Sequence, residues 1–244
     1  MKKRLVSSFF ALFTANLLMA QVLVFTPVKV EKQDVEQFLN VEMNYSKKIA
    51  QNAVNSGDLM GWALLEATNP RPGDFNYLWV NAYPDIDTAA NKRAWWENSE
   101  AVLGIKPEIL FSNMSNYQFD RSYTYKMMVN IPNVAPASYV ILNFATPDDL
   151  EGVIASTKKY VIPHFNKNMK DHGMVGWGMA GKITPQGKDY SSMMTYDSYD
   201  SLANAMKHLA GEGIIEGLPI DKLSPINWEM RALMKVVSAT GPKQ

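Results

Sequence analysis

The sequence predicts an α+β fold in which one β-α-β-β-α-β unit is written twice along the chain. The first observation is that Gly61-Trp62 recurs as Gly176-Trp177, at a shift of 176 − 61 = 115 residues. The second is that strand and helix patterns follow in the same order in both segments. The third is a set of identities without a gap at that shift: Asp34 and Asp149, Glu36 and Glu151, Tyr45 and Tyr160, Pro70 and Pro185, Asp74 and Asp189, Asp85 and Asp200, Ala90 and Ala205, Lys92 and Lys207.

The first unit opens with a strand and a long helix. Residues 21–30 are apolar and β-branched, and Pro27 indicates an edge position or a bend. A helical pattern starts at Asp34 and ends before Gly57, a suitable residue after a helix C-terminus. Its apolar residues recur at spacings of three and four, which is the stripe of an amphipathic helix: Val35, Phe38, Leu39, Met43, Ile49, Ala50 and Ala53.

A hairpin, a second helix and a last strand complete the first unit. Strands 59–68 and 74–83 flank a turn rich in Pro and Gly. Both faces of 74–83 are largely apolar, which predicts a sheet covered on both sides. A helix is predicted over 87–102 and a strand over 119–131.

The second unit repeats this order after a short connector at 132–136. Thr146 and Pro147 are typical of a helix start, and Pro163 predicts a kink in the helix that follows. The closing strand matches the first unit at a shift of 109, for instance Phe119 with Trp228. The predicted elements are strands 137–145, 173–182, 189–196 and 226–239, a helix over 146–170, and a short helix from 198 or 200 to 209.

Composition excludes several classes of function. Lys+Arg and Asp+Glu balance at 24 each, which argues against a nucleic-acid partner and gives no reason to expect an anionic membrane surface. The chain has no cysteine, so disulfides, thiolate catalysis and cysteine metal sites are excluded. Fifteen methionines are best explained as fillers of irregular gaps in the core.

The first 20 residues resemble a secretory signal peptide. Lys2, Lys3 and Arg4 precede an apolar stretch that is short for a membrane span, and Ala20 is a suitable residue before a cleavage site. The alternative is an uncleaved anchor. We therefore expect a periplasmic or secreted protein without stable membrane insertion after cleavage, divided into a signal peptide (1–20), a first unit (21–132) and a second unit (137–244).

Two tandem ferredoxin-like β-α-β-β-α-β units in one chain resemble the dimeric α+β barrel superfamily. The resemblance rests on element order and on the duplicated Gly-Trp hairpin, and it implies two sheets packed as one fused barrel with helices outside. The rival arrangement is two independent domains, which the short connector disfavours. The superfamily includes cofactor-free monooxygenases, haem-dependent enzymes and members of unknown role. None of their catalytic motifs can be transferred to residues of this sequence.

The candidate ligand-binding residues are aromatic. Trp62 and Trp177 line a cleft or, as the simpler explanation, anchor the packing of each half. An aromatic-rich face of the first unit, less aromatic in the second, predicts a lopsided interior that holds a flat apolar ligand; unequal packing of the halves is the alternative. The residues proposed for ligand binding are Trp62, Tyr77, Trp79, Tyr123, Tyr125 and Trp177.

His164 is the candidate catalytic residue, as a general base or a haem ligand. It lies next to Pro163, and the first unit has Ile49 at the matching position. A solvated or hydrogen-bonded helix histidine is the alternative. His172 and His208 suit helix C-termini, and the three histidines show no metal-ligand spacing, so no metal site is predicted.

Three functions follow as hypotheses. The first is an exported protein that binds a small apolar or aromatic molecule. The second is a cofactor-free or haem-dependent monooxygenase-like enzyme. The third is a structural or interaction protein whose barrel is filled by side chains. The sequence leaves the cofactor, the ligand, catalysis and the oligomeric state open.

Overall fold

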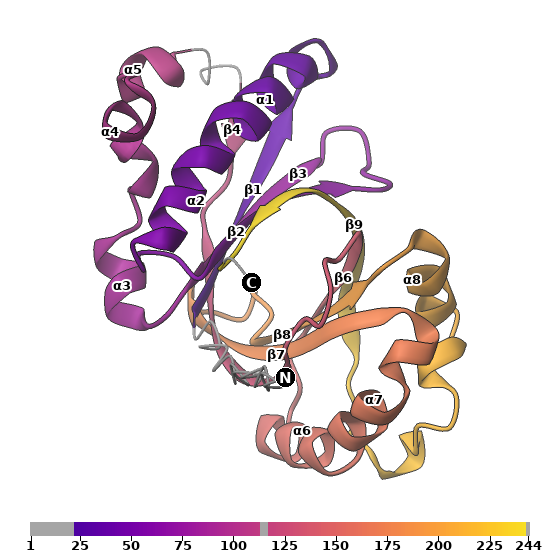
Figure 1. Ribbon diagram of the computed structural model, residues 1–244. Coiled ribbons are helices and arrows are strands. Elements are labelled where there is room, and N and C mark those ends of the chain that lie inside the picture. Colours follow the sequence, from indigo (N-terminus) through magenta and orange to yellow (C-terminus); the bar gives the residue numbers. More distant parts are fainter. Residues whose placement is uncertain (1–21, 113–116, 243–244) are drawn as a thin grey trace, which may run out of the picture.

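The computed structural model describes residues 22–112 and 117–242, so the predicted signal peptide lies outside the described residues. The predicted α+β class is confirmed. Eight antiparallel strands close into a barrel, and helices cover it on two opposite sides (Figure 1). The strands are β1 (Val22–Val30), β2 (Gly61–Ala67), β3 (Tyr77–Tyr83), β4 (Tyr117–Phe119), β5 (Tyr123–Ile131), β6 (Tyr139–Ala145), β7 (Met174–Thr184), β8 (Met193–Tyr199) and β9 (Trp228–Thr240).

The barrel closes within one chain. Its strand order is β3-β2-β9-β6-β8-β7-β5-β1, and β1 pairs back with β3, while the short β4 lies beside β1. The first half (22–131) and the second half (139–240) meet at two antiparallel seams, β2 with β9 and β5 with β7. The alternative of two independent domains is therefore wrong.

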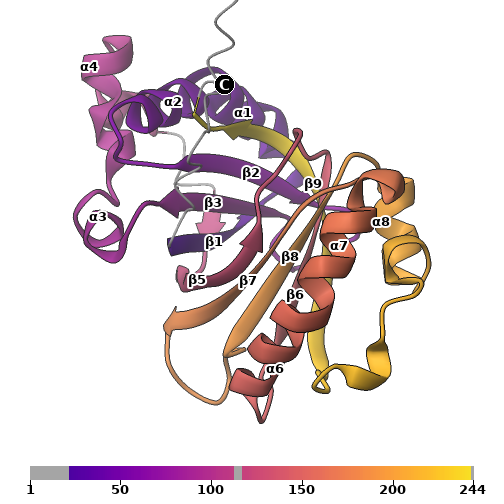
Figure 2. The same cartoon turned by 60° about the horizontal axis from the view of Figure 1, so that its bottom comes forward.

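The helices of each half pack on its own side of the barrel (Figures 1 and 2). Both long helices contain a π-helical turn, and the two turns are 157 − 42 = 115 residues apart. The first-half helices are α1 (Val35–Val41), the π turn Glu42–Ser46, α2 (Lys47–Asn55), α3 (Ile86–Asn91), the 3-10 turn Trp95–Asn98, α4 (Ser99–Leu103) and α5 (Pro107–Leu110). The second-half helices are α6 (Leu150–Ser156), the π turn Thr157–Val161, α7 (Ile162–Asn168), the 3-10 turn Met169–His172 and α8 (Leu202–Leu209).

Two predicted elements are broken in the structure. The helix expected over 87–102 is three short pieces, because the Trp95 indole turns back to the sheet and donates a hydrogen bond to Asn81 Oδ1 at 3.0 Å. The strand expected over 119–131 is divided into β4 and β5. Both pair with β1, and a side-chain hydrogen bond of 2.8 Å between Thr26 and Ser122 spans the interruption.

The hairpin strands also start later than expected, at Tyr77 and Met193. The helix that was expected to kink at Pro163 contains a π turn that ends at Val161, two residues before the proline. The first-half helix has the same turn with Lys48 at the position that matches Pro163. A proline is therefore not required for such a turn.

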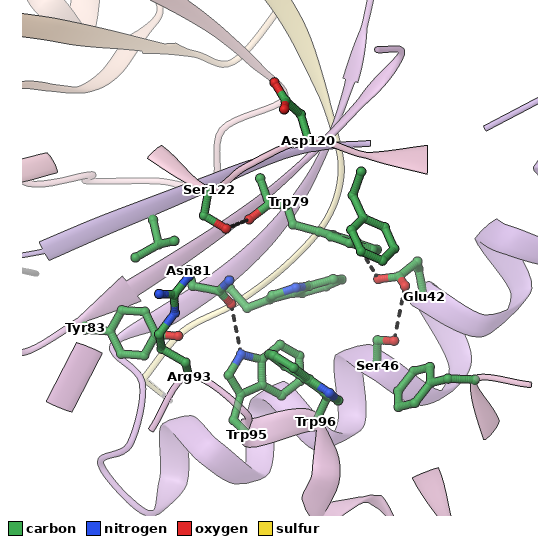
Figure 3. A pocket seen from close by; sticks show the side chains of 15 residues that line it. Glu42, Ser46, Trp79, Asn81, Tyr83, Arg93, Trp95, Trp96, Asp120 and Ser122 are labelled. Carbon is green, nitrogen blue, oxygen red and sulfur yellow. Dashed lines mark hydrogen bonds between the residues drawn. The ribbon is translucent and has the colours of Figure 1, made fainter. Parts of the chain in front are cut away.

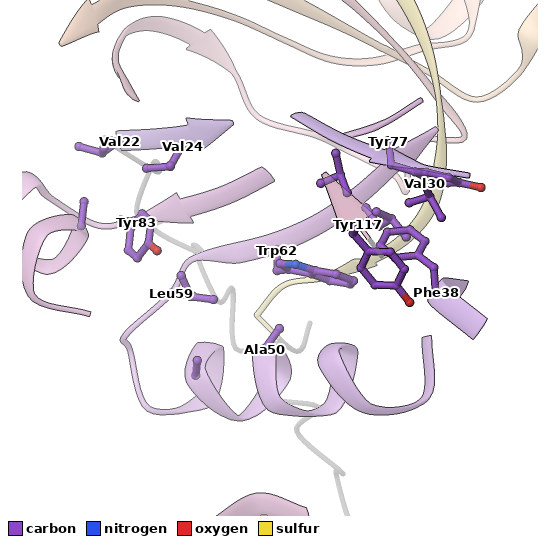
Figure 4. Packing of buried hydrophobic residues seen from close by; sticks show 14 residues of the cluster. Val22, Val24, Val30, Phe38, Ala50, Leu59, Trp62, Tyr77, Tyr83 and Tyr117 are labelled. Carbon is purple, nitrogen blue, oxygen red and sulfur yellow. The ribbon is translucent and has the colours of Figure 1, made fainter. Parts of the chain in front are cut away.

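Three hydrophobic cores stabilise the molecule. One lies between the first-half sheet and its helices, where Trp62 packs near Phe38 and Ala50 (Figure 4). A second fills the corresponding space in the second half, around Trp177. The third fills the barrel interior. Because side chains fill the interior, the helix-covered outer faces are the places where a ligand could bind.

Side chains from both halves form the interior core. They include Leu23 and Phe25 from the first half and Leu142, Met194 and Met234 from the second. Each strand alternates, so its other side chains face the helices. Among the described residues, no helix combines the length and the apolar character that a membrane crossing requires.

Candidate functional site

A cavity of about 390 Å³ lies between the outer face of the first-half sheet and the helices that cover it. We call it the first-half cavity. Seven aromatic side chains dominate its walls: Trp62, Trp79, Tyr83, Trp95, Trp96, Phe111 and Phe119. Glu42 lies at one end, Tyr83 and Arg93 lie at the other, and Trp79, Trp95 and Trp96 lie between them (Figure 3).

The alternation of β3 positions the floor of the cavity. Trp79, Asn81 and Tyr83 are two residues apart, so all three point away from the barrel interior. The opposite set, Leu78 and Val80, belongs to the interior core. The cavity is the space that remains between these large side chains and the helices above them.

Glu42 is the only acidic side chain among the described residues that is both in this cavity's wall and buried, at 2 % exposed. It lies in the π turn of the long helix. Trp79 Nε1 donates to Glu42 Oε2 at 3.1 Å, and Ser46 Oγ donates to Oε1 at 3.3 Å. Burial raises the pKa of the Glu42 carboxyl to about 7, and the two hydrogen bonds oppose that shift in part. Glu42 can therefore exchange a proton near neutral pH.

The mouth of the cavity is aromatic and open to solvent. Trp96 is 40 % exposed and Phe119 is 58 % exposed. Trp96 meets Trp95 edge to face at 6.0 Å between ring centroids, and Phe119 lies 6.1 Å from Trp79. Large apolar side chains left exposed around a cavity are typical of a ligand entrance.

The structure brings only some of the sequence-predicted residues together. Trp62 and Trp79 both line the first-half cavity. Tyr77 lies on the same face but is buried against Phe38, with 4.8 Å between ring centroids. Trp177 lines a different cavity, in the second half.

The expectation of one shared aromatic face is wrong for the β5 tyrosines. Val22 of β1 lies opposite both Tyr83 and Lys126, so Tyr83 and Lys126 share a face and Tyr125 points the other way. Tyr123 and Tyr125 accordingly contact the barrel-interior core. Strand alternation predicts the faces within one strand, but only the register relates one strand to another.

Both ring nitrogens of His164 have hydrogen-bond partners within the protein. Its Nε2 lies 2.8 Å from the carbonyl oxygen of Ile214, and Asn168 lies 3.3 Å from its Nδ1. It lines none of the three cavities described for residues 22–112 and 117–242. The contact with Ile214 connects α7 to the 3-10 turn Gly213–Ile215, which comes after α8 in the chain. A catalytic role for His164 stays a prediction that this placement does not favour.

Glu42 is the residue that sequence reasoning missed. It lies on the apolar stripe of the first long helix, four residues before Ser46 and three after Leu39. An acidic residue within an apolar stripe indicates a buried carboxylate with a specific partner, since Glu is rarely buried without one. The partner, Trp79, is 37 residues away in the sequence.

The second-half cavity, of about 520 Å³, has a polar floor. Asn143 Nδ2 donates to Thr195 Oγ1 at 2.9 Å and to Asp197 Oδ2 at 2.5 Å, while Arg231 Nε donates to Asn143 Oδ1 at 2.7 Å. His208, also in the wall, lies 2.5 Å from the Tyr199 hydroxyl through Nδ1. Burial lowers the pKa of His208, although Asp197 acts in the opposite direction. Most polar groups of this floor are therefore hydrogen-bonded to one another.

Solved structures similar to this one fall into a few related kinds. A putative monooxygenase from Fusobacterium nucleatum has a TM-score of 0.60 and 12% identity, over 91% of this chain and 95% of that chain. A haem-binding protein from Thermus thermophilus has a TM-score of 0.56 and 10% identity, over 90% and 92%. A putative chlorite dismutase has a TM-score of 0.54 and 9% identity, over 89% and 95%.

These neighbours have the dimeric α+β barrel fold, and the barrel of this chain has the same architecture. At such low identity the likeness shows the fold alone. No protein-family model matches the sequence. No curated protein matches it either.

The histidine and the tyrosine that line the two large cavities are poorly suited to hold a haem iron. A haem needs an axial ligand such as His, Cys, Met or Tyr. His208 is hydrogen-bonded at Nδ1 and faces Asp197 Oδ2 at 3.9 Å through Nε2. In the first-half cavity the one phenol is Tyr83, and burial raises the pKa of its hydroxyl to about 12, with Arg93 opposing the shift. The described residues also hold no group of three His, Cys, Asp or Glu side chains placed for a metal ion.

Proposed function

We propose that the protein binds a small apolar or aromatic molecule in the first-half cavity. The observation that carries the proposal is an aromatic-walled space of about 390 Å³ with an exposed aromatic mouth and one buried acid. Ligand pockets have this character: mostly apolar walls, few polar groups and a volume of roughly 300–1,000 Å³. The filled barrel interior supports this cavity over the interior as the binding site.

Binding of 1-naphthol tests this function. We expect saturable one-to-one binding, followed by tryptophan fluorescence or calorimetry. Trp96→Ala should weaken it by about tenfold, because ring stacking and the apolar area of the indole are both lost. Trp228→Ala is the matched control, since Trp228 is similarly exposed, at 36 %, but lies in the second half. Equal affinities for the two variants would argue against the first-half cavity.

A cofactor-free, monooxygenase-like reaction is the second candidate. The specific observation in its favour is Glu42, whose pKa of about 7 suits a general base at neutral pH. Glu42 would remove a proton from the bound molecule, and dioxygen would oxidise the resulting anion, with one oxygen atom entering the product and the other leaving as water. Structural neighbours described as putative monooxygenases support the same candidate.

A haem-dependent version is not proposed, and it can be tested separately. Titration with hemin should give the spectrum of free hemin, without the sharp Soret band of a ligated complex. The His208→Ala variant should behave in the same way, because His208 is already bonded within the protein. A ligated Soret band that disappears in His208→Ala would contradict this prediction.

We also propose that the protein is exported, on the basis of residues 1–20. Export would place the mature protein in the periplasm or outside the cell. N-terminal sequencing of protein expressed with its natural leader should begin at Gln21. An N-terminus that retains the leader would contradict this.

We infer further that the two halves descend from one copied ferredoxin-like unit. The spatial order of the four long strands supports the inference, since it is β5-β1-β3-β2 in one half and β9-β6-β8-β7 in the other. These orders correspond strand for strand. The π turns at the same shift of 157 − 42 = 115 residues also support it.

A further inference from the structure

We propose that the preferred ligand of the first-half cavity is an organic cation, an apolar molecule that carries an ammonium group. The inference rests on the proposed binding function of this cavity and names the chemical class of the ligand. It stands on the combination of a buried carboxylate without a cationic partner and a wall of electron-rich rings.

Glu42 is a buried carboxylate without a cationic partner among the described residues. Glu42 receives hydrogen bonds from two neutral donors, the Trp79 indole and the Ser46 hydroxyl. Among the described residues, no Lys, Arg or His nitrogen forms an ion pair with it. A buried charge left without a partner is costly, and a neutral ligand does nothing to offset that cost. A ligand cation would supply the missing partner.

The aromatic wall of the cavity also favours a cation. Indole rings attract cations through their faces more strongly than the rings of Tyr or Phe do. Four tryptophans line this cavity: Trp62, Trp79, Trp95 and Trp96. Figure 3 shows Trp79 on one side of the space and Trp96 on the other, with Glu42 at the end of the gap. A cationic head beside Glu42 would therefore meet both the carboxylate and ring faces.

The other charged side chains of the cavity lie at its exposed parts. Arg93 is exposed and lies beside Tyr83, at the end opposite Glu42. Asp120 is exposed as well. Water and salt screen both side chains, so the buried carboxylate should decide which sign of charge the cavity prefers.

Three probes of similar shape separate charge from size. They are benzyltrimethylammonium, its neutral isostere neopentylbenzene, and the anion phenylmethanesulfonate. Affinities are measured at pH 8, where Glu42 is ionised. We expect the cation to bind at least about tenfold more tightly than the neutral isostere, and the anion to bind least, because a desolvated cation gains both ring and carboxylate contacts.

Two variants identify the responsible group. Glu42→Gln keeps a hydrogen-bond acceptor for Trp79 but removes the charge. It should weaken the cation by roughly tenfold and leave neopentylbenzene unchanged. Asp120→Asn removes an exposed carboxylate from the same cavity and should change the cation affinity by less than about twofold.

Each outcome bears on the inference. A cation preference that Glu42→Gln abolishes and Asp120→Asn preserves supports it. Equal binding of cation and neutral isostere, tightest binding of the anion, or equal losses in both variants would overturn it and leave the proposed binding function standing. If neither these probes nor 1-naphthol bind, the proposed binding function fails, and this inference fails with it.

Discussion

At pH 8 the Glu42→Gln variant should be more stable than the wild-type protein by about 3 kcal/mol in free energy of unfolding. In the folded protein the pKa of Glu42 is raised to about 7, against 4.5 when it is exposed. The folded state therefore binds a proton more tightly than the unfolded state. The stability that this proton contributes is complete below pH 4.5 and is lost as the pH rises through 7. Glutamine carries no charge, so the variant avoids the loss.

The pH profile is the decisive readout. Urea denaturation at pH 4 should give wild type and Glu42→Gln the same stability within about 0.5 kcal/mol, with the difference opening between pH 4.5 and 8. Glu36→Gln, an exposed position on the same helix, is the matched control and should change little at either pH. A Glu42→Gln variant that is less stable than wild type at pH 8 would mean that the carboxylate is well paired when charged.

Shortening one interior methionine should destabilise the whole barrel. Met194 is fully buried, in the interior core that both halves build. Met194→Ala should reduce the free energy of unfolding by about 2–5 kcal/mol, the usual loss for a buried methionine that leaves a cavity. Since the interior belongs to both halves, unfolding should stay a single transition. Circular dichroism and tryptophan fluorescence should report the same midpoint.

Met230 provides the control for that experiment. It is 52 % exposed and lies on β9, so Met230→Ala should change the stability by no more than about 0.5 kcal/mol. Two separate transitions, with only the second half destabilised, would contradict a shared interior. Equal stabilities of Met194→Ala and Met230→Ala would contradict a tightly packed interior.

The barrel was predictable because its signals are local and repeated. The Gly61-Trp62 and Gly176-Trp177 pairs both lie at or near the starts of hairpin strands, β2 and β7. Hydrophobic periodicity placed the long strands and helices to within a few residues, apart from the starts of β3 and β8 and the pieces of 87–102 and 119–131. Local pattern failed over 87–102, where the contact of Trp95 with the sheet replaces helix continuation.

The candidate site was predictable only in part. The repeated Gly-Trp pair identified Trp62 and strand alternation identified Trp79, and both do line the cavity. It could not exclude Tyr123 and Tyr125, because their face depends on the register of β1 with its neighbours. Glu42 depends on a hydrogen bond from Trp79, and no pattern within the long helix predicts that contact.

A crystal structure of the protein with bound 1-naphthol tests the central claim most directly, since it locates the ligand itself. We expect the naphthyl ring between Trp79 and Trp96, in contact with the Glu42 end of the first-half cavity. A naphthol molecule ordered in the second-half cavity or in the barrel interior, with the first-half cavity empty, would contradict the account.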